Sequence, residues 1–197
     1  MMTTQHNTVE IDVSQVPEDK RADQRYLSLL ANMQQGCADP RLVNAICIHE
    51  AGHAFFLGHA GFTTPSTCGP RIIYDPDNDV FNGEGSSVKF GGIDDEYRKK
   101  IDSRDWLGRV AKGYAAGGVA ARVLANSVDK GDGDDRANFN AIFARIKRDN
   151  PTMTWTSDSL WADAQRAVEA DLRNVQIKKV ILDCAEGLKP DLFRMSA

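Results

Sequence analysis

The sequence contains no run of apolar residues long enough to cross a membrane, so we expect no membrane partner. Residues 1–20 are polar and acidic and lack the basic start and apolar centre of a secretory signal. Only four cysteines occur, scattered and without a Cys-x-x-Cys pair, which favours free thiols in a reducing compartment. We therefore expect a cytoplasmic protein. Lysine and arginine number 24 against 28 acidic residues, and this balance argues against a nucleic-acid partner.

The sequence also has no Gly-x-x-x-x-Gly-Lys-Ser/Thr segment, so we expect no ATP hydrolysis by this chain itself. What it does have is 197 residues, of which 42% are apolar and 26% charged, values typical of a globular protein. We expect one domain over residues 21–197, preceded by a loose N-terminal arm over residues 1–20. The alternation of residues 8–13 predicts one short strand in that arm.

Apolar spacing predicts a mainly α fold with a small β-hairpin beside the helix that carries the site described below. Asp39 and Pro40 are suited to the N-cap and first position of one helix. The helical spacing of apolar residues near the end of the chain is only approximate, which allows the last expected helix to be interrupted by a break. Strands expected at Arg71–Tyr74 and Ser86–Phe90 would pair as a long-looped hairpin. The expected helices cover residues 23–36, 40–58, 103–126, 134–148 and 156–187.

Residues 49–53 read His-Glu-Ala-Gly-His and lie in the middle of the expected helix 40–58. Residues four apart share a helix face, so His49 and His53 can aim ring nitrogens at one zinc ion. Glu50 then lies beside the ion and can pass a proton from the attacking water to a leaving amine. Three such side chains are costly among apolar residues unless they serve a purpose. A surface helix with incidental histidines and a site that has lost its metal are the alternatives.

A zinc site of this type needs a third protein ligand, and two candidates compete. His59 has the spacing of the elongated metzincin motif, but that motif requires a glycine where this chain has Phe56. If the helix continues, His59 is turned about 120° from His53 and lies about 9 Å further along the axis. The other candidate is a carboxylate from the acidic segment 129–135, which precedes a helix start that favours negative charge. Helix geometry therefore favours the acidic segment.

Three segments resemble the FtsH-type ATP-dependent zinc metalloproteases. Residues 48–54, Ile-His-Glu-Ala-Gly-His-Ala, resemble the zinc motif of that family, and residues 117–121, Gly-Gly-Val-Ala-Ala, resemble its Gly-Gly-Arg-Ala-Ala-Glu helix. Residues 131–135, Gly-Asp-Gly-Asp-Asp, resemble its Gly-x-x-x-Asp segment, which ends in the third zinc ligand. The resemblance covers about residues 41–147, the peptidase portion only. It implies that His49, His53 and Asp135 bind Zn²⁺ and that Glu50 is the catalytic base.

The chain departs from the family in its middle helix, where Val119 and Arg122 replace an arginine and a glutamate. Asp132 and Asp134 are rivals to Asp135. Together these patterns predict a zinc metalloendopeptidase that cleaves flexible or unfolded polypeptides, with a separate ATPase or further copies of the chain as candidate partners. The alternatives are a non-catalytic, zinc-stabilised interaction module on a protease-like fold and a metzincin-type peptidase using His59.

Two weaker patterns have simpler interpretations. Asp75, Asp77 and Asp79 imitate the start of a calcium loop, but Val80 and Ser86 occupy its glycine and glutamate positions, so we expect a solvated turn. The glycine pair 117–118 inside a helix indicates close helix packing.

Overall fold

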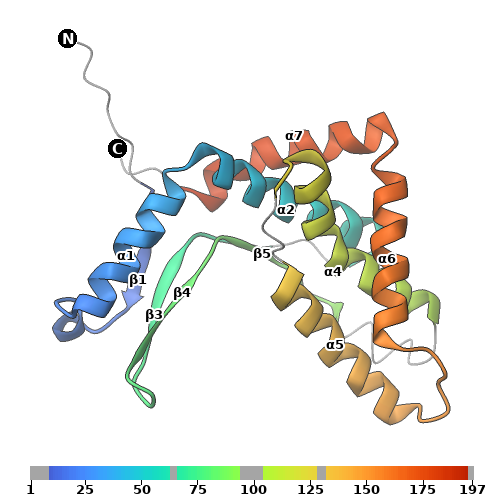
Figure 1. Ribbon diagram of the computed structural model, residues 1–197, viewed down its shortest axis with the longest axis horizontal. Helices are drawn as coiled ribbons and strands as arrows, with labels where there is room; N and C mark the ends of the chain where they lie inside the picture. Colours follow the sequence, from blue (N-terminus) through green and yellow to red (C-terminus); the bar gives the residue numbers. More distant parts are fainter. Residues whose placement is uncertain (1–8, 63–65, 94–103, 128–131, 195–197) are drawn as a thin grey trace.

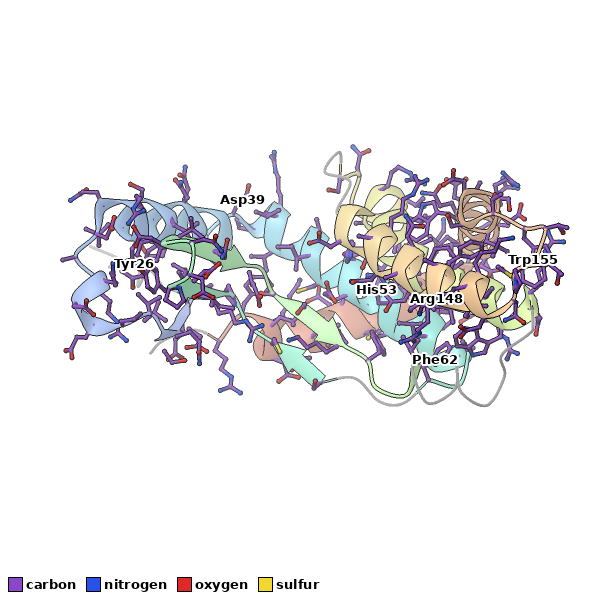
Figure 2. All side chains as sticks on the ribbon, turned by 90° about the horizontal axis from the view of Figure 1, so that it is seen from below. Tyr26, Asp39, His53, Phe62, Arg148 and Trp155 are labelled. Carbon is purple, nitrogen blue, oxygen red and sulfur yellow. The ribbon has the colours of Figure 1, made fainter. Side chains whose placement is uncertain are left out.

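The computed structural model describes residues 9–62, 66–93, 104–127 and 132–194, and its fold is mainly α, as predicted. Its helices are α1 (Gln24–Cys37), α2 (Pro40–His59), α4 (Arg104–Leu124), α5 (Asp132–Asp149), α6 (Ser157–Asp171) and α7 (Val175–Leu192). Its strands are β1 (Asp12–Gln15), β2 (Ser66–Cys68), β3 (Arg71–Asp75), β4 (Val80–Glu84) and β5 (Ser87–Lys89). Figure 2 shows Tyr26 and Trp155 at opposite ends of an elongated molecule, with His53 between them.

Helix α2 is central, because it packs against both α4 and α7 (Figure 1). It starts as predicted, with the Asp39 side chain accepting a hydrogen bond of 2.8 Å from the backbone N–H of Arg41. Small residues bring α2 close to α4. A methyl group added at Gly52 would lie 2.8 Å from the carbonyl oxygen of Ala116, so glycine is required at this contact.

Two apolar clusters hold the helices together on either side of the α2–α4 pair. The first joins α4, α5 and α6 around Phe139, Trp106 and Trp161, each no more than 3% exposed. The second joins α2, α4 and α7 and includes Ile181 of α7. The final helical stretch does break, since Asn174 accepts a hydrogen bond from the N–H of Gln176 and so caps the start of α7.

The predicted hairpin between Arg71–Tyr74 and Ser86–Phe90 is wrong. Strand β3 instead pairs antiparallel with β4, and β5 pairs with β2. The reason is the short turn after β3, where the Asp75 carboxylate accepts hydrogen bonds from the N–H groups of Asp77 and Asn78. Asp79 adopts a φ of 50°, so the chain reverses at once and residues 80–84 become the nearest partner.

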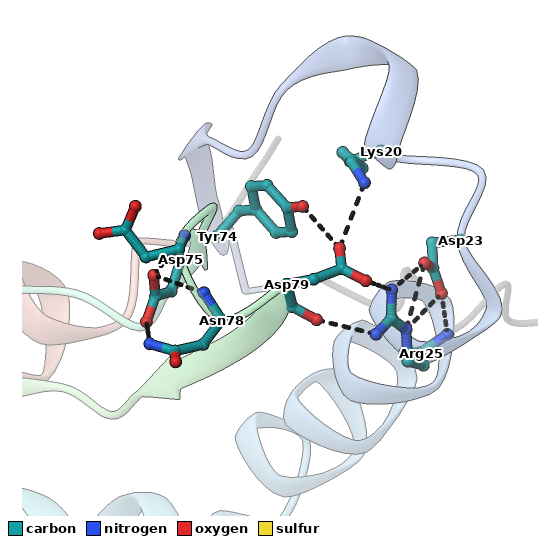
Figure 3. A network of polar contacts seen from close by, with 8 residues as sticks. Lys20, Asp23, Arg25, Tyr74, Asp75, Asn78 and Asp79 are labelled. Atoms are coloured by element: carbon teal, nitrogen blue, oxygen red, sulfur yellow. Dashed lines mark hydrogen bonds and ion pairs between the residues drawn. The ribbon is translucent and has the colours of Figure 1, made fainter.

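Asp79 joins this turn to the start of α1 through a polar network (Figure 3). Its carboxylate accepts a hydrogen bond of 2.6 Å from the hydroxyl of Tyr74 and pairs with Lys20 at 3.2 Å and Arg25 at 3.1 Å. The Tyr74 bond and the two cations lower the pKa of Asp79 to about 2. The carboxylate is thus neutralised by protein cations, which agrees with a solvated turn and not with a calcium loop.

Residues 9–20 differ from the loose arm that the sequence predicts. Strand β1 lies at Asp12–Gln15, a few residues later than expected, and pairs in parallel with β3. Val16 is only 1% exposed, and the N–H of Glu10 donates to the carbonyl of Arg194 at 2.8 Å. These contacts pack the segment against the body of the protein, while residues 1–8 lie outside the described residues.

All four cysteines are free, as predicted. Within the described ranges, no helix is both long and apolar enough to cross a bilayer.

Candidate metal centre

Two imidazoles and one carboxylate meet between α2 and α5. The Nε2 atoms of His49 and His53 lie 3.0 Å apart, and Oδ2 of Asp135 lies 3.2 Å from the first and 3.1 Å from the second. A tetrahedral ion with bonds of about 2.0–2.1 Å would separate its ligand atoms by about 3.3 Å. The triangle is close to that size, so these three residues form a candidate metal-binding site.

The orientation of His53 is set from the side opposite to this triangle. Its Nδ1 atom lies 2.8 Å from the carbonyl oxygen of Gly113 in α4, and its side chain is buried. A carbonyl oxygen can only accept a hydrogen bond, so Nδ1 carries the hydrogen. In the neutral ring, Nε2 then has a free lone pair that points at Asp135 and can bind a metal.

Gly117 of α4 lies directly against both imidazoles. A methyl group added there would come within 2.6 Å of Nε2 of His49 and closer still to Nε2 of His53. The sequence predicts close helix packing at this glycine, and the neighbours that pack against it are the two histidine rings. Any larger residue would have to displace at least one of the ligand atoms.

Asp135 is the member of the acidic segment that reaches the histidines. Helix α5 starts at Asp132, two residues earlier than predicted, so Asp135 lies in its first turn and is shielded to 17% side-chain exposure. Asp134 is exposed on the cleft wall and is not part of the triangle. The side chain of Asp132 lies outside the described residues.

His59 lies away from the triangle because α2 continues without a break to that residue. Its ring is exposed and stacks on Phe55 with a centroid distance of 4.1 Å, and its Nδ1 lies 3.0 Å from the carbonyl oxygen of Phe55. The geometric argument against His59 is therefore correct, and the elongated metzincin arrangement does not form in this structure.

Asp135 and His53 each stabilise the charged form of the other. Burial by itself raises the pKa of Asp135, but hydrogen bonds from His49 and His53 outweigh it and lower the pKa to about 2. Burial likewise lowers the pKa of His53, whereas its contacts with Asp135 raise it to about 9. In the absence of a metal, a proton therefore neutralises Asp135 at the position where a cation would bind.

Glu50 is 7% exposed and lies at the edge of the same site. Its Oε2 atom accepts a hydrogen bond of 2.7 Å from the backbone N–H of Val88 in β5. Burial raises the pKa of this carboxyl, and the nearby imidazoles only partly oppose that effect. A buried carboxylate with one fixed hydrogen bond and a raised pKa is suited to accept and release a proton.

A cleft of about 770 Å³ opens over these residues. One wall is α2, and the other is the extended segment 83–90. Gly85 and Ser86 lie near the first turns of α2, Val88 lies at Glu50, and Phe90 packs on the cluster that contains Leu57. The extended segment therefore passes along α2 from its first turns to Glu50, beside the triangle.

Sequence reasoning missed Val88 and Gly113, because each acts through a backbone group that every residue type carries. The glycine at 117 was visible as a helix irregularity, but the residues that pack against it were not.

Comparison with protein-family models, with curated proteins and with solved structures finds no match to this chain.

Proposed function

We propose that this chain is a zinc-dependent metalloendopeptidase that hydrolyses flexible or unfolded polypeptides. The observation that carries the proposal is the convergence of His49, His53 and Asp135 beside Glu50 at the floor of an open cleft. Two imidazoles and one carboxylate are a usual ligand set for catalytic zinc and leave the fourth position free for water or substrate.

Each residue has a definite part in the proposed reaction. The two histidines and Asp135 hold the metal, and the Gly113 carbonyl keeps His53 in the tautomer that can bind it. A bound zinc ion would lower the pKa of a water molecule towards about 7 and polarise the scissile carbonyl. Glu50 takes the proton from the attacking water and delivers it to the leaving amine. The backbone N–H of Val88 fixes the position of the Glu50 carboxylate through its hydrogen bond to Oε2.

The shape of the cleft supports cleavage within a chain. It extends on both sides of the triangle, from Arg71 and Glu84 at one end to Leu57 and Ile93 at the other. An extended polypeptide can lie between α2 and segment 83–90 and pair with the backbone of that segment. Main-chain pairing of this kind provides affinity with little dependence on sequence.

We further propose kinship with the peptidase domain of the FtsH-type proteases. The residue that the resemblance designates as third ligand, Asp135, is the one that lies 3.1 Å from His53, and the helix with the glycine pair is the one that supports both histidines. A separate ATPase would then supply unfolded substrate, and further copies of the chain are the other candidate partner.

A non-catalytic module is the second candidate, because a metal bound by residues of α2 and α5 would also join these two helices.

One experiment separates the peptidase from the non-catalytic module. Zinc content and hydrolysis of a flexible peptide are measured for the wild type, Glu50→Gln and His49→Ala. A peptidase predicts that Glu50→Gln keeps zinc and loses hydrolysis, whereas His49→Ala loses both. Zinc binding by a wild type that hydrolyses no flexible peptide would support the module.

A further inference from the structure

Three polar or charged side chains are buried in the part of the chain that the structure describes, namely Glu50, His53 and Ser86. The first two belong to the metal centre, whereas the proposed reaction gives no part to Ser86. A buried hydroxyl needs a hydrogen-bond partner, because burying it unpaired costs free energy. The Oγ atom of Ser86 donates to the backbone carbonyl oxygen of Leu192 at 3.2 Å, across 106 residues of sequence.

The partner of Ser86 is the end of helix α7. Leu192 is the last residue of that helix, and its carbonyl is one of those that a helix end leaves without an intrahelical partner. The end of α7 is itself held in place, because Leu192 is fully buried and the carbonyl oxygen of Arg194 accepts a hydrogen bond of 2.8 Å from the N–H of Glu10. Ser86 therefore ties segment 83–90 to a fixed point of the body.

Ser86 lies two residues before Val88, whose backbone N–H donates to Oε2 of Glu50 at 2.7 Å. The side chains of both residues are buried, and Val88 packs in the same apolar cluster as Leu192. Side chains two residues apart on an extended chain point to the same side, so both face the end of α7. A shift of the chain at Ser86 would therefore move the N–H group that holds the Glu50 carboxylate.

We propose that Ser86 is a positioning residue for Glu50, because its hydrogen bond to the end of α7 holds segment 83–90 where the N–H of Val88 meets the carboxylate. This inference rests on the proposed peptidase function and adds a residue to it that binds no metal. Glu50 must reach both the attacking water and the leaving nitrogen. Misplacing a catalytic group by about 1 Å can lower a rate by about 100-fold.

Removal of the hydroxyl tests the proposal through the kinetics. Zinc-loaded Ser86→Ala should hydrolyse a flexible peptide with kcat and kcat/KM both lowered at least about tenfold, because the base acts only during the reaction. Its zinc affinity should equal that of the wild type, since the three ligands lie on α2 and α5. Ser66→Ala is the matched control, because Ser66 is exposed on the neighbouring strand β2, and it should keep the wild-type kcat.

Two further substitutions at the same position separate the hydroxyl from the volume of the side chain. Ser86→Thr keeps the hydroxyl and should retain most of the wild-type kcat, since a cavity of about 190 Å³ beside Ser86 has room for the added methyl group. Ser86→Cys keeps the shape but donates weakly, so its kcat should lie between those of the threonine and alanine variants. Circular dichroism checks that each variant folds, and Ser86→Cys provides the test if Ser86→Ala does not.

A purely structural role would lower the free energy of unfolding without changing the folded enzyme, so a local measurement is also needed. Amide hydrogen exchange, followed by NMR in the zinc-loaded protein, provides it. In Ser86→Ala the amide of Val88 should exchange at least about tenfold faster than in the wild type, because its bond to a charged group is weakened. The amide of Ile181, buried on α7, is the internal reference and should exchange as in the wild type.

The outcomes distinguish this inference from the proposed function. A wild-type kcat in folded Ser86→Ala, an equal loss in Ser86→Ala and Ser86→Thr, or unchanged exchange at Val88 overturns the role of Ser86 and leaves the peptidase function intact. A zinc-loaded wild type that hydrolyses no flexible peptide overturns the peptidase function. The exchange at Val88 then still decides whether Ser86 holds this segment against Glu50, since faster exchange in Ser86→Ala supports the anchor and unchanged exchange overturns it.

Discussion

The Nδ1 atom of His53 donates a hydrogen bond of 2.8 Å to the carbonyl oxygen of Gly113, sixty residues further along the chain. The bond crosses from α2 to α4 and turns the opposite ring nitrogen towards Asp135 of α5. Three helices therefore determine the position of one imidazole. The metal site therefore depends on how these helices pack.

Asp135→Ala should lower zinc affinity by at least about a hundredfold, since losing even an indirect partner of a zinc ligand costs about 10- to 100-fold. His59→Ala should bind zinc as the wild type does, because His59 is exposed and points away from the triangle. Competition with a chromophoric chelator measures both affinities. Loss of zinc in His59→Ala with retention in Asp135→Ala would reverse the ligand assignment.

Gly117→Ala should weaken zinc binding, because the added methyl group would displace the Nε2 atoms of both histidines. Gly108 lies on the same helix, and a methyl group added there meets nothing within 4 Å. Gly108→Ala should therefore keep full zinc affinity and raise the free energy of unfolding by about 0.5–1 kcal/mol. Zinc titration and urea unfolding test the pair. Equal zinc affinity in the two variants would contradict the role of Gly117.

The metal-free protein should lose stability as the pH rises from 6.5 to about 9. The pKa of His53 rises from 6.5 to about 9 on folding, so its ion pair with Asp135 contributes fully below pH 6.5 and is lost as the pH passes about 9. We expect a loss of roughly 1–3 kcal/mol, measured by urea unfolding in EDTA. Asp135→Asn removes the charge and should abolish most of this loss, and a pH dependence unchanged in that variant would contradict the pairing.

Zinc binding should strengthen over the same pH range, because the proton on His53 must leave before the metal can bind. The effect is measured by competition titrations at several pH values between 6.5 and 9. Affinity that is constant across this range would show that His53 holds no proton in the metal-free site.

The purified chain should cleave unfolded polypeptides far better than folded ones. The cleft of about 770 Å³ admits an extended segment, and the 197 residues contain no phosphate loop that could power unfolding. A disulfide-bonded protein offered in its native form and in its reduced, unfolded form provides matched substrates. Comparable rates on both forms would contradict this prediction.

Much of the site could be predicted from the sequence because its signals are local. Asp39 and Pro40 mark the start of α2, and the four-residue spacing of His49 and His53 puts them on one face of it. No glycine or proline lies between His53 and Gly58, so the helix was expected to continue and to turn His59 away from His53. These inferences need only helix geometry and capping chemistry, which act over one or two turns.

The tertiary structure decided what depends on contacts between distant segments. Strand pairing was mispredicted because Ser86–Phe90 could pair with either β2 or β3, and a closer strand at Val80–Glu84 already occupied β3. The hydrogen bonds from Val88 to Glu50 and from His53 to Gly113 use backbone atoms, which carry no residue-type signal. The sequence by itself therefore determined which side chains could bind a metal, whereas helix packing determined the third ligand position, the orientation of the rings and the shape of the cleft around them.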